Sequence, residues 1–233
     1  MYKYIASTEK GCERAENEDR ILVNSRVLSN GSINGTQRTT LIAAIADGIS
    51  GTIGGDIAAE TAVNCFKTMD TKHLSALAIF RLLSVANNRI LSKQKDNKEI
   101  ENMGTTLAGV IFAKNKYFIF CIGDTIVLEL NDDRLVPCVE HFPLDDKRCL
   151  KNYLGGAGNV FSPIVKRGHL HEDKKTFVIF SDGVYDRIPM EEINKIIASD
   201  ENLRNKKEAV FQLALKYGST DDKSLILIEY QKG

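Results

Sequence analysis

The chain has 233 residues, enough for one large domain or two small ones with a substantial buried core. Lysine and arginine total 31, aspartate and glutamate also total 31, and the formal net charge is therefore zero. This balance gives no electrostatic reason to expect nucleic acid or an anionic membrane as a partner. The longest apolar runs are far shorter than a membrane span, and the N-terminal residues lack the apolar core of a signal peptide.

Cysteine usage indicates a reducing compartment. The chain contains an odd number of cysteines with no Cys-x-x-Cys pair, namely Cys12, Cys65, Cys121, Cys138 and Cys149. Such a dispersed set favours reduced thiols over a disulfide framework or a zinc site. We therefore expect a cytoplasmic protein.

The first part of the chain is expected to form neighbouring antiparallel strands. Residues 2–7 are predicted as an edge strand, and residues 20–28 and 40–46 as the strands that follow it. Residues 29–38 are rich in Asn and Gly, and they are predicted to form a loose connection.

Two helices are predicted next, over residues 56–69 and 74–95, from apolar residues at helical spacing. Asp56 is placed where a helix N-cap is expected. The charged residues 93–101 are interpreted as a solvated helix end and loop.

The second half alternates differently. Three strands are predicted to form a meander with turns at residues 114–115 and 123–124. Two more strands are predicted after it, and two amphipathic helices lie between those two. These strands are 105–113, 116–122, 125–130, 175–180 and 224–230, and the helices are 191–199 and 203–217. Separate runs of strands and helices argue for an α+β fold with mostly antiparallel sheets. Neither a linker nor an internal repeat is visible, and we expect one domain over residues 1–233.

The stretch over residues 41–56 carries the clearest chemical signal. An apolar run ends at Ala46, and Asp47 follows it on a turn that contains Gly48, Gly51, Gly54 and Gly55. Glycines allow the backbone to fold tightly and to approach a ligand closely. A carboxylate held at a strand end beside such a turn suits a hard cation, although an ordinary turn with a capping aspartate has the same pattern.

Acidic residues recur at the ends of other predicted strands. They are Glu18 and Asp19 before residues 20–28, Asp124 after Gly123, Asp182 after residues 175–180, and Asp221 and Asp222 before the last strand. If these groups converge, they form an oxygen-rich pocket suited to Mg²⁺ or Mn²⁺.

Other polar groups have a weaker signal. The acidic residues Asp132, Asp133, Asp145 and Asp146 lie in polar loops, where solvated side chains are the simpler interpretation. The histidines His141, His169 and His171 have no Cys or Glu at zinc-ligand spacing. Residues 154–158 are glycine-rich, but they lack the Lys-Ser/Thr of a P-loop and the GxGxxG of a dinucleotide fold.

The order of the acidic motifs resembles the metal-dependent, type 2C family of protein serine/threonine phosphatases, and its bacterial members in particular. The matching motifs extend from near the first residue to near the last. They are Arg14 with Asn17-Glu18-Asp19, Ala46-Asp47-Gly48 with Gly54-Gly55, Gly104-Thr105-Thr106, Gly123-Asp124, Ser181-Asp182-Gly183 and Asp221-Asp222. The resemblance implies two packed antiparallel sheets flanked by helix pairs, an α-β-β-α sandwich with a metal cleft at one edge.

The resemblance also implies a cofactor of two core Mg²⁺ or Mn²⁺ ions. Asp47 corresponds to the carboxylate that bridges both ions, and the Gly48 carbonyl and Glu18 to ligands of one of them. Asp182 and Asp221 correspond to ligands of the other ion. The implied metal-site residues are Glu18, Asp19, Asp47, Gly48, Asp124, Asp182 and Asp221.

Three residues have more particular implied roles. Asp19 matches a residue that orders coordinated water, and Asp124 matches one that holds a third, weaker cation together with Asp182 in bacterial members. Arg14 matches the phosphate-binding arginine, whose planar fork suits bidentate oxygen contacts. The implied catalytic residues are therefore Asp47 and Arg14.

The implied activity is hydrolysis of phosphoserine and phosphothreonine in proteins by a metal-activated water, with no protein nucleophile. The implied partners are a phosphorylated protein and a cognate Ser/Thr kinase, and we expect a monomer that binds neither nucleic acid nor membrane. The sequence departs from the family pattern at Ile49 (often His in eukaryotic members), at Ile126 (usually Arg) and at Asp222 (usually Asn).

Two alternatives stay open. One is a pseudophosphatase, a binding module that keeps the fold to recruit a partner. The other is a metal-dependent phosphatase of a small phosphorylated metabolite, because substrate choice would be set by loops such as the flap-like residues 132–159.

Overall fold

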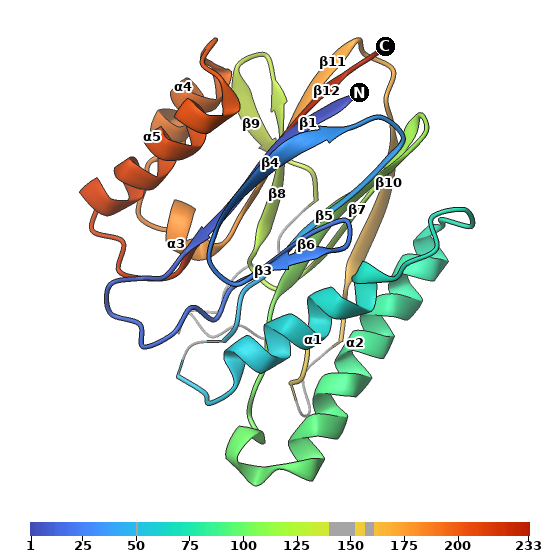
Figure 1. Cartoon of the computed structure of the whole chain (residues 1–233), viewed down its shortest axis with the longest axis vertical. Coiled ribbons are helices and arrows are strands. Elements are labelled where there is room, and N and C mark those ends of the chain that lie inside the picture. Colours follow the sequence, from blue (N-terminus) through green and yellow to red (C-terminus); the bar gives the residue numbers. More distant parts are fainter. Residues whose placement is uncertain (50, 140–151, 157–160) are drawn as a thin grey trace.

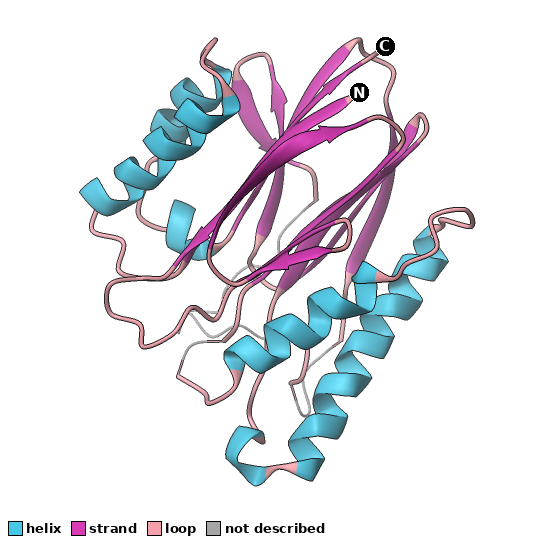
Figure 2. Ribbon diagram, viewed as in Figure 1, coloured by secondary structure: helices cyan, strands magenta, loops and turns pink. Residues whose placement is uncertain are grey.

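The structure is a computed structural model that describes residues 1–49, 51–139, 152–156 and 161–233. Its strands form two six-stranded sheets, and every pair of neighbouring strands in the described residues is antiparallel (Figures 1 and 2). The first sheet has the order β4-β1-β12-β11-β8-β9 and the second β10-β7-β6-β5-β2-β3. The strands are β1 (Tyr2–Glu9), β2 (Arg20–Val23), β3 (Arg26–Leu28), β4 (Gly31–Gln37), β5 (Thr40–Ala46), β6 (Leu107–Ala113), β7 (Lys116–Ile122), β8 (Ile126–Asn131), β9 (Arg134–Pro137), β10 (Ile164–His169), β11 (Lys174–Phe180) and β12 (Lys223–Gln231).

Helices cover the outer face of each sheet (Figure 2). α1 and α2 lie against the second sheet, and α4 and α5 lie against the first, with the short α3 near the end of α5 (Figure 1). The helices are α1 (Gly55–Lys67), α2 (Ala76–Asp96), α3 (Asp182–Tyr185), α4 (Met190–Ala198) and α5 (Leu203–Lys216), with a 3₁₀ turn, η1, at Lys98–Ile100. The predicted α-β-β-α sandwich is therefore confirmed. Among the described helices, none combines the length and the apolar character needed to cross a membrane.

The central strands have continuous apolar sequences because both of their faces are covered. In β12, Ile226 and Ile228 pack between the two sheets, whereas Leu225 and Leu227 pack against α4 and α5. Successive side chains of a strand point to opposite faces, and a strand with both faces covered is apolar at every position. The same holds for β5, where Ile45 faces the other sheet and Ala44 faces α1.

The structure corrects the predicted arrangement of the first strands. Residues 2–7 were expected at an edge, but β1 pairs with both β12 and β4, and β4 forms the edge. The predicted loose connection over residues 29–38 is this edge strand, whose polar sequence reflects its exposure. Residues 20–28 are not one strand but the hairpin β2–β3, which turns at Asn24 with φ 53°. This hairpin lies in the second sheet, so it is not a neighbour of β1.

Two further expectations were wrong. The predicted meander breaks after β7, because β8 joins the other sheet, and the chain changes sheets at Gly123, whose φ is 101°. Asp56 is not the N-cap of α1, because Gly54 occupies that position in the left-handed conformation. Asp56 lies in the first turn of the helix instead, where its Oδ2 is 3.3 Å from Nη2 of Arg20.

The layer between the second sheet and its helices generates a stability prediction. Phe66 of α1 is fully buried and stacks on Phe120 of β7, with ring centroids 4.6 Å apart. Phe66→Ala should lower the free energy of unfolding by about 3–5 kcal/mol, because it removes this contact and leaves a cavity. Urea denaturation measures the change. The control is Leu77→Ala on the exposed side of α2, which should change stability by less than about 0.5 kcal/mol; equal losses in the two variants would contradict the packing.

Candidate metal centre

Strand register brings the first two predicted carboxylates together. β2 and β5 are antiparallel, and Arg20 pairs with Ala46. The next residues outward are therefore Asp19, before β2, and Asp47, after β5. Asp19 is fully buried, whereas Asp47 keeps a small exposed area at the edge of the sandwich.

The first sheet delivers three more carboxylates to the same edge. β11 pairs with β8 through Phe180 and Ile126, so Asp182 and Asp124 continue that pairing outward. Asp221 precedes β12, the other neighbour of β11. The five aspartates thus come from both sheets, and their convergence requires the sandwich.

Electrostatic coupling confirms that these groups face one another. Burial raises the pKa of Asp47 well above its usual range, and the charges of Asp19, Asp182, Asp124 and Asp221 raise it further. Burial likewise raises the pKa of Asp182 to about 7, with contributions from Asp124 and Asp221, while a hydrogen bond to Asp47 opposes the shift. Without cations, the cluster therefore retains protons near neutral pH.

Asp19 has an oxygen with no partner. Its Oδ2 accepts a hydrogen bond from Ser181 Oγ at 3.0 Å, but its buried Oδ1 accepts none from the described residues. Burial raises the pKa of this carboxyl to about 7, and the nearby Asp222 and Asp182 add to the increase. A buried acceptor without a donor is costly, and a cation or the water around it would satisfy this oxygen.

The glycine turn after β5 packs directly against Glu18. A Cβ on Gly48 would lie 2.6 Å from the Gly55 carbonyl carbon, and a Cβ on Gly55 would lie 2.9 Å from Glu18 Oε1. Only glycine fits such an approach. Burial raises the pKa of Glu18, and the charge of Arg14 opposes that increase.

Two threonines hold the turn in place. The Asp47 carbonyl accepts hydrogen bonds from Thr106 N and Thr105 Oγ1, both at 2.8 Å, and Asp47 N donates to Thr106 Oγ1 at 3.0 Å. The sequence motif at residues 104–106 therefore fixes the backbone of Asp47 through hydrogen bonds. The position of this motif in the sequence did not reveal that role.

Arg14 pairs with one of the predicted metal-site residues. Its Nη2 lies 2.6 Å from Asp221 Oδ1, and its Nε donates to the same oxygen at 2.8 Å. Beside Arg14 a cleft of about 430 Å³ opens between its loop and residues 51–56, and Glu18 also lines it. Arg14 therefore lies between the carboxylates and an open cleft.

The donor set fits divalent cations that prefer oxygen. Carboxylates from separate segments, a glycine-lined approach and the orphaned oxygen of Asp19 together match the chemistry of Mg²⁺ and Mn²⁺. Within the described residues, no three His, Cys, Asp or Glu side chains are yet spaced to hold one ion. Protons held by these aspartates compete with a cation, because carboxylate ligands must be deprotonated.

The other polar groups stay outside this cluster. Asp132 and Asp133 are exposed at the β8–β9 turn, and His169 stacks on His171 with ring centroids 5.5 Å apart. Leu154 exchanges backbone hydrogen bonds with Thr105. The described part of the 154–158 segment therefore supports the threonine that binds the Asp47 carbonyl. Asp145, Asp146, His141 and the rest of that segment, residues 157–158, lie outside the described residues.

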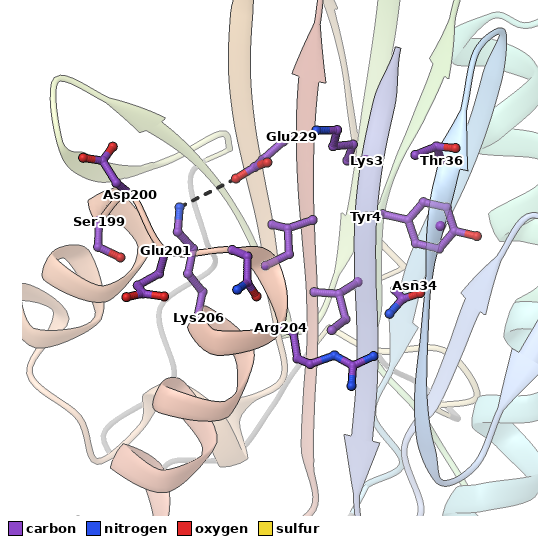
Figure 3. A pocket seen from close by; sticks show the side chains of 14 residues that line it. Lys3, Tyr4, Asn34, Thr36, Ser199, Asp200, Glu201, Arg204, Lys206 and Glu229 are labelled. Atoms are coloured by element: carbon purple, nitrogen blue, oxygen red, sulfur yellow. Dashed lines mark ion pairs between the residues drawn. The ribbon is translucent and has the colours of Figure 1, made fainter.

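A larger cavity, of about 670 Å³, lies elsewhere on the molecule (Figure 3). It is lined by β1, β4 and the start of α5, and Lys206 Nζ is 3.6 Å from Glu229 Oε1 across it. None of the five aspartates lines this cavity. Its mixed charge and its distance in the fold from the carboxylate edge separate it from the candidate metal centre.

The retained protons generate a pH prediction. The native state holds protons on Asp19 and Asp182 up to about pH 7, whereas an unfolded chain releases them near pH 4. The native state then binds more protons over this interval, so the metal-free protein should lose stability as pH rises from about 4 to about 7. Because Mn²⁺ competes with these protons, it should raise Tm more at about pH 7.5 than at about pH 5.

Thermal melts across this pH range, with and without Mn²⁺, provide the measurement. Asp19→Asn and Asp182→Asn are the matched variants, since each removes one titrating carboxyl and should flatten the slope of Tm against pH. A slope that is the same in the wild type and in both variants would show that these groups do not control it.

Comparison with known proteins identifies the family of the chain. The family model described as protein phosphatase 2C matches residues 29–218. The serine/threonine phosphatase stp of Listeria welshimeri is 25% identical to this chain, over 97% of this chain and 96% of that protein. Protein phosphatase PhpP of Streptococcus pneumoniae is also 25% identical, over 95% of this chain and 94% of its own.

Solved structures share the fold. The serine/threonine phosphatase Stp1 from Staphylococcus aureus aligns over 100% of this chain and 96% of its own, with a TM-score of 0.83 and 18% identity. The catalytic domain of the phosphatase PstP, in complex with two manganese ions, covers 100% of both chains with a TM-score of 0.80 and 20% identity. Since the family model spans most of the sequence, the chain belongs to the protein phosphatase 2C family.

Proposed function

We propose that this chain is a protein phosphatase that hydrolyses phosphoserine and phosphothreonine with the help of Mg²⁺ or Mn²⁺. The observation that carries the proposal is the convergence of five aspartates, from both sheets, around a buried oxygen that accepts no hydrogen bond from the described residues. Membership of the protein phosphatase 2C family and relatives named as serine/threonine phosphatases support it. A structural neighbour in complex with two manganese ions supports the choice of metal.

The residues that would hold two core ions divide into two groups. Asp47, at the centre of the coupled set, is proposed as the ligand shared by both ions. Glu18 and the Gly48 carbonyl are proposed for one ion, and Asp182 and Asp221 for the other. When bound, such ions would supply Lewis-acid activation of water and neutralise charge on the phosphoryl oxygens.

Two further aspartates are proposed as helpers. Asp19, with its free Oδ1, would order water beside the ions. Asp124 would hold a third, weaker cation together with Asp182, whose charge it faces. Tyr185 steadies this position, because its hydroxyl donates to the Asp124 carbonyl at 2.8 Å.

Arg14 is proposed to bind the phosphoryl group of the substrate. Its guanidinium lies at the boundary between Asp221 and the open cleft, and a planar fork can contact two phosphoryl oxygens at once. Ile49 cannot donate a proton, so the leaving serine or threonine oxygen would take its proton from water. The chain's own residues therefore position the substrate and orient water, and no protein nucleophile is needed.

The presence of every proposed donor counts against a pure binding module, the first alternative. Relatives named as protein phosphatases favour a protein substrate over a small metabolite. We further propose a cytoplasmic monomer, formed by one domain, that opposes a cognate Ser/Thr kinase.

Substitution of the shared ligand tests the central assignment. Asp47→Asn should lower Mn²⁺-dependent hydrolysis of p-nitrophenyl phosphate by more than the roughly 10–100-fold typical of outer ligands, because it weakens both ions at once. The matched control is Asp173→Asn, which removes one exposed carboxylate at the turn between β10 and β11 and should keep normal turnover. Near-normal turnover in folded Asp47→Asn would make the assignment wrong.

Substitution of Arg14 tests the division between substrate and metal binding. Arg14→Ala should weaken binding of a phosphopeptide and of inorganic phosphate by about 1.5–3 kcal/mol, the value of a charge-assisted hydrogen bond. Arg14→Lys should recover only part of this loss, because an ammonium lacks the fork. Arg14 pairs with Asp221 but is not itself a proposed ligand, so its substitution should not weaken Mn²⁺ binding in calorimetric titrations of either variant, and a collapse of Mn²⁺ binding would refute the role.

A further inference from the structure

Asp222 is buried at the junction of three segments that build the site, and its side chain has other hydrogen-bond partners than that of the adjacent Asp221. Its Oδ1 accepts a hydrogen bond from Gly11 N at 2.8 Å, and its Oδ2 accepts one from Glu18 N at 2.8 Å. Only 4% of the residue is exposed. The two donors are 211 and 204 residues away along the chain, so these bonds connect opposite ends of the sequence.

The two hydrogen bonds enclose the loop that carries Arg14. Gly11 and Glu18 lie at its two ends, and Arg14 N donates to the Gly11 carbonyl at 3.3 Å within it. One carboxylate therefore closes both ends of the loop and limits where the guanidinium of Arg14 and the carboxylate of Glu18 can lie.

The surrounding packing leaves little room for adjustment. A Cβ on Gly11 would lie 2.2 Å from the Thr220 carbonyl oxygen, and a Cβ on Gly183 would lie 2.0 Å from the Asp222 carbonyl oxygen. The loop, the segment before β12 and the turn after β11 are thus in direct backbone contact around Asp222. A shift of Asp222 would be transmitted to all three.

The chemistry of the side chain matches its two donors. An ionised carboxylate offers two acceptor oxygens, whereas an amide offers one oxygen and directs an NH₂ group at the second donor. Hydrogen bonds to a charged acceptor are also stronger than those to a neutral one. An aspartate at residue 222 therefore holds both backbone N–H groups, which an asparagine cannot.

We propose that Asp222 is a positioning residue, which fixes the loop over residues 11–18 so that Arg14 meets the substrate phosphoryl group and Glu18 meets the metal. The roles of Arg14 and Glu18 in this statement rest on the proposed function. Both oxygens of Asp222 are engaged by backbone donors, so it acts through the loop and is not itself a ligand. Its neighbour Asp221 has the contrasting position, beside Arg14 at the cleft.

The first test measures the loop without metal or substrate. Amide hydrogen exchange of the metal-free protein, resolved by NMR, should show faster exchange at both Gly11 and Glu18 in Asp222→Ala. In Asp222→Asn, which keeps one acceptor, only one of the two amides should lose protection. Wild-type exchange at both amides in Asp222→Ala would overturn the proposal.

The second test measures the consequence for activity. Asp222→Ala should lower kcat/KM on a phosphothreonine peptide by roughly 10–100-fold, the usual loss for a supporting residue, through a higher KM and a weaker apparent Mn²⁺ affinity. Asp222→Asn should recover part of the loss. Altered exchange with unchanged KM and Mn²⁺ affinity would show a purely structural role and overturn the positioning role.

Asp56→Asn serves as the charge control. Asp56 and Asp222 both raise the pKa of Glu18 by their charge, but Asp56 pairs with Arg20 and contacts neither loop amide. Asp56→Asn should therefore leave exchange at Gly11 and Glu18 unchanged, and an effect equal to that of Asp222→Ala would refute the proposal.

If Asp222→Ala does not fold, the loss of protection at a single amide in Asp222→Asn tests the proposal in its place. The exchange result does not depend on activity. A wild type that is inactive on all phosphopeptides would therefore contradict the proposed function, whereas the exchange experiment would still test the position of the loop.

Discussion

Repulsion among carboxylates at one edge of the sandwich is the constraint on which the rest of the structure depends. Asp47 lies within the field of four other aspartates, and Asp19 and Asp182 retain protons to about pH 7. Charges of one sign gathered in a partly buried site destabilise a fold unless protons or cations neutralise them. The remainder of the chain has to hold this cluster together against its own repulsion.

Hydrogen bonds to the backbone and close backbone packing supply much of the support for this cluster. Thr105 and Thr106 clamp the carbonyl of Asp47, and Gly48 and Gly55 allow the turn to close on Glu18. Such contacts are rigid, because a backbone held by several hydrogen bonds has little freedom to relax. This frame gathers the titratable side chains at one edge, where protons and divalent cations compete for them.

Long-range pairing unites the two ends of the chain at this edge. Arg14 and Asp222 belong to segments more than 200 residues apart, yet each bonds across the gap, Arg14 to Asp221 and Asp222 to Gly11 and Glu18. β1 and β12 are adjacent strands, and their pairing brings the loop after β1 against the segment before β12. The segment that carries Arg14 and the segment that carries Asp221 and Asp222 are therefore held together through one strand pair.

The sequence by itself determined the element types and the chemistry of the strand ends. The run before Asp47 and the run before Asp182 were identified as strands because apolar content and flanking glycines are local properties. The order of the acidic motifs was enough to identify the family resemblance and the sandwich. Only the tertiary structure decided which sheet each strand joined: β1 is internal, residues 31–37 form an edge strand, and β8 leaves the meander. It also placed Arg14 against Asp221, left Asp19 Oδ1 without a donor in the described part of the chain and gave Asp222 its two backbone donors. These features depend on contacts between residues far apart in sequence, which local periodicity does not encode, because the same strand pattern fits either sheet until both are assembled.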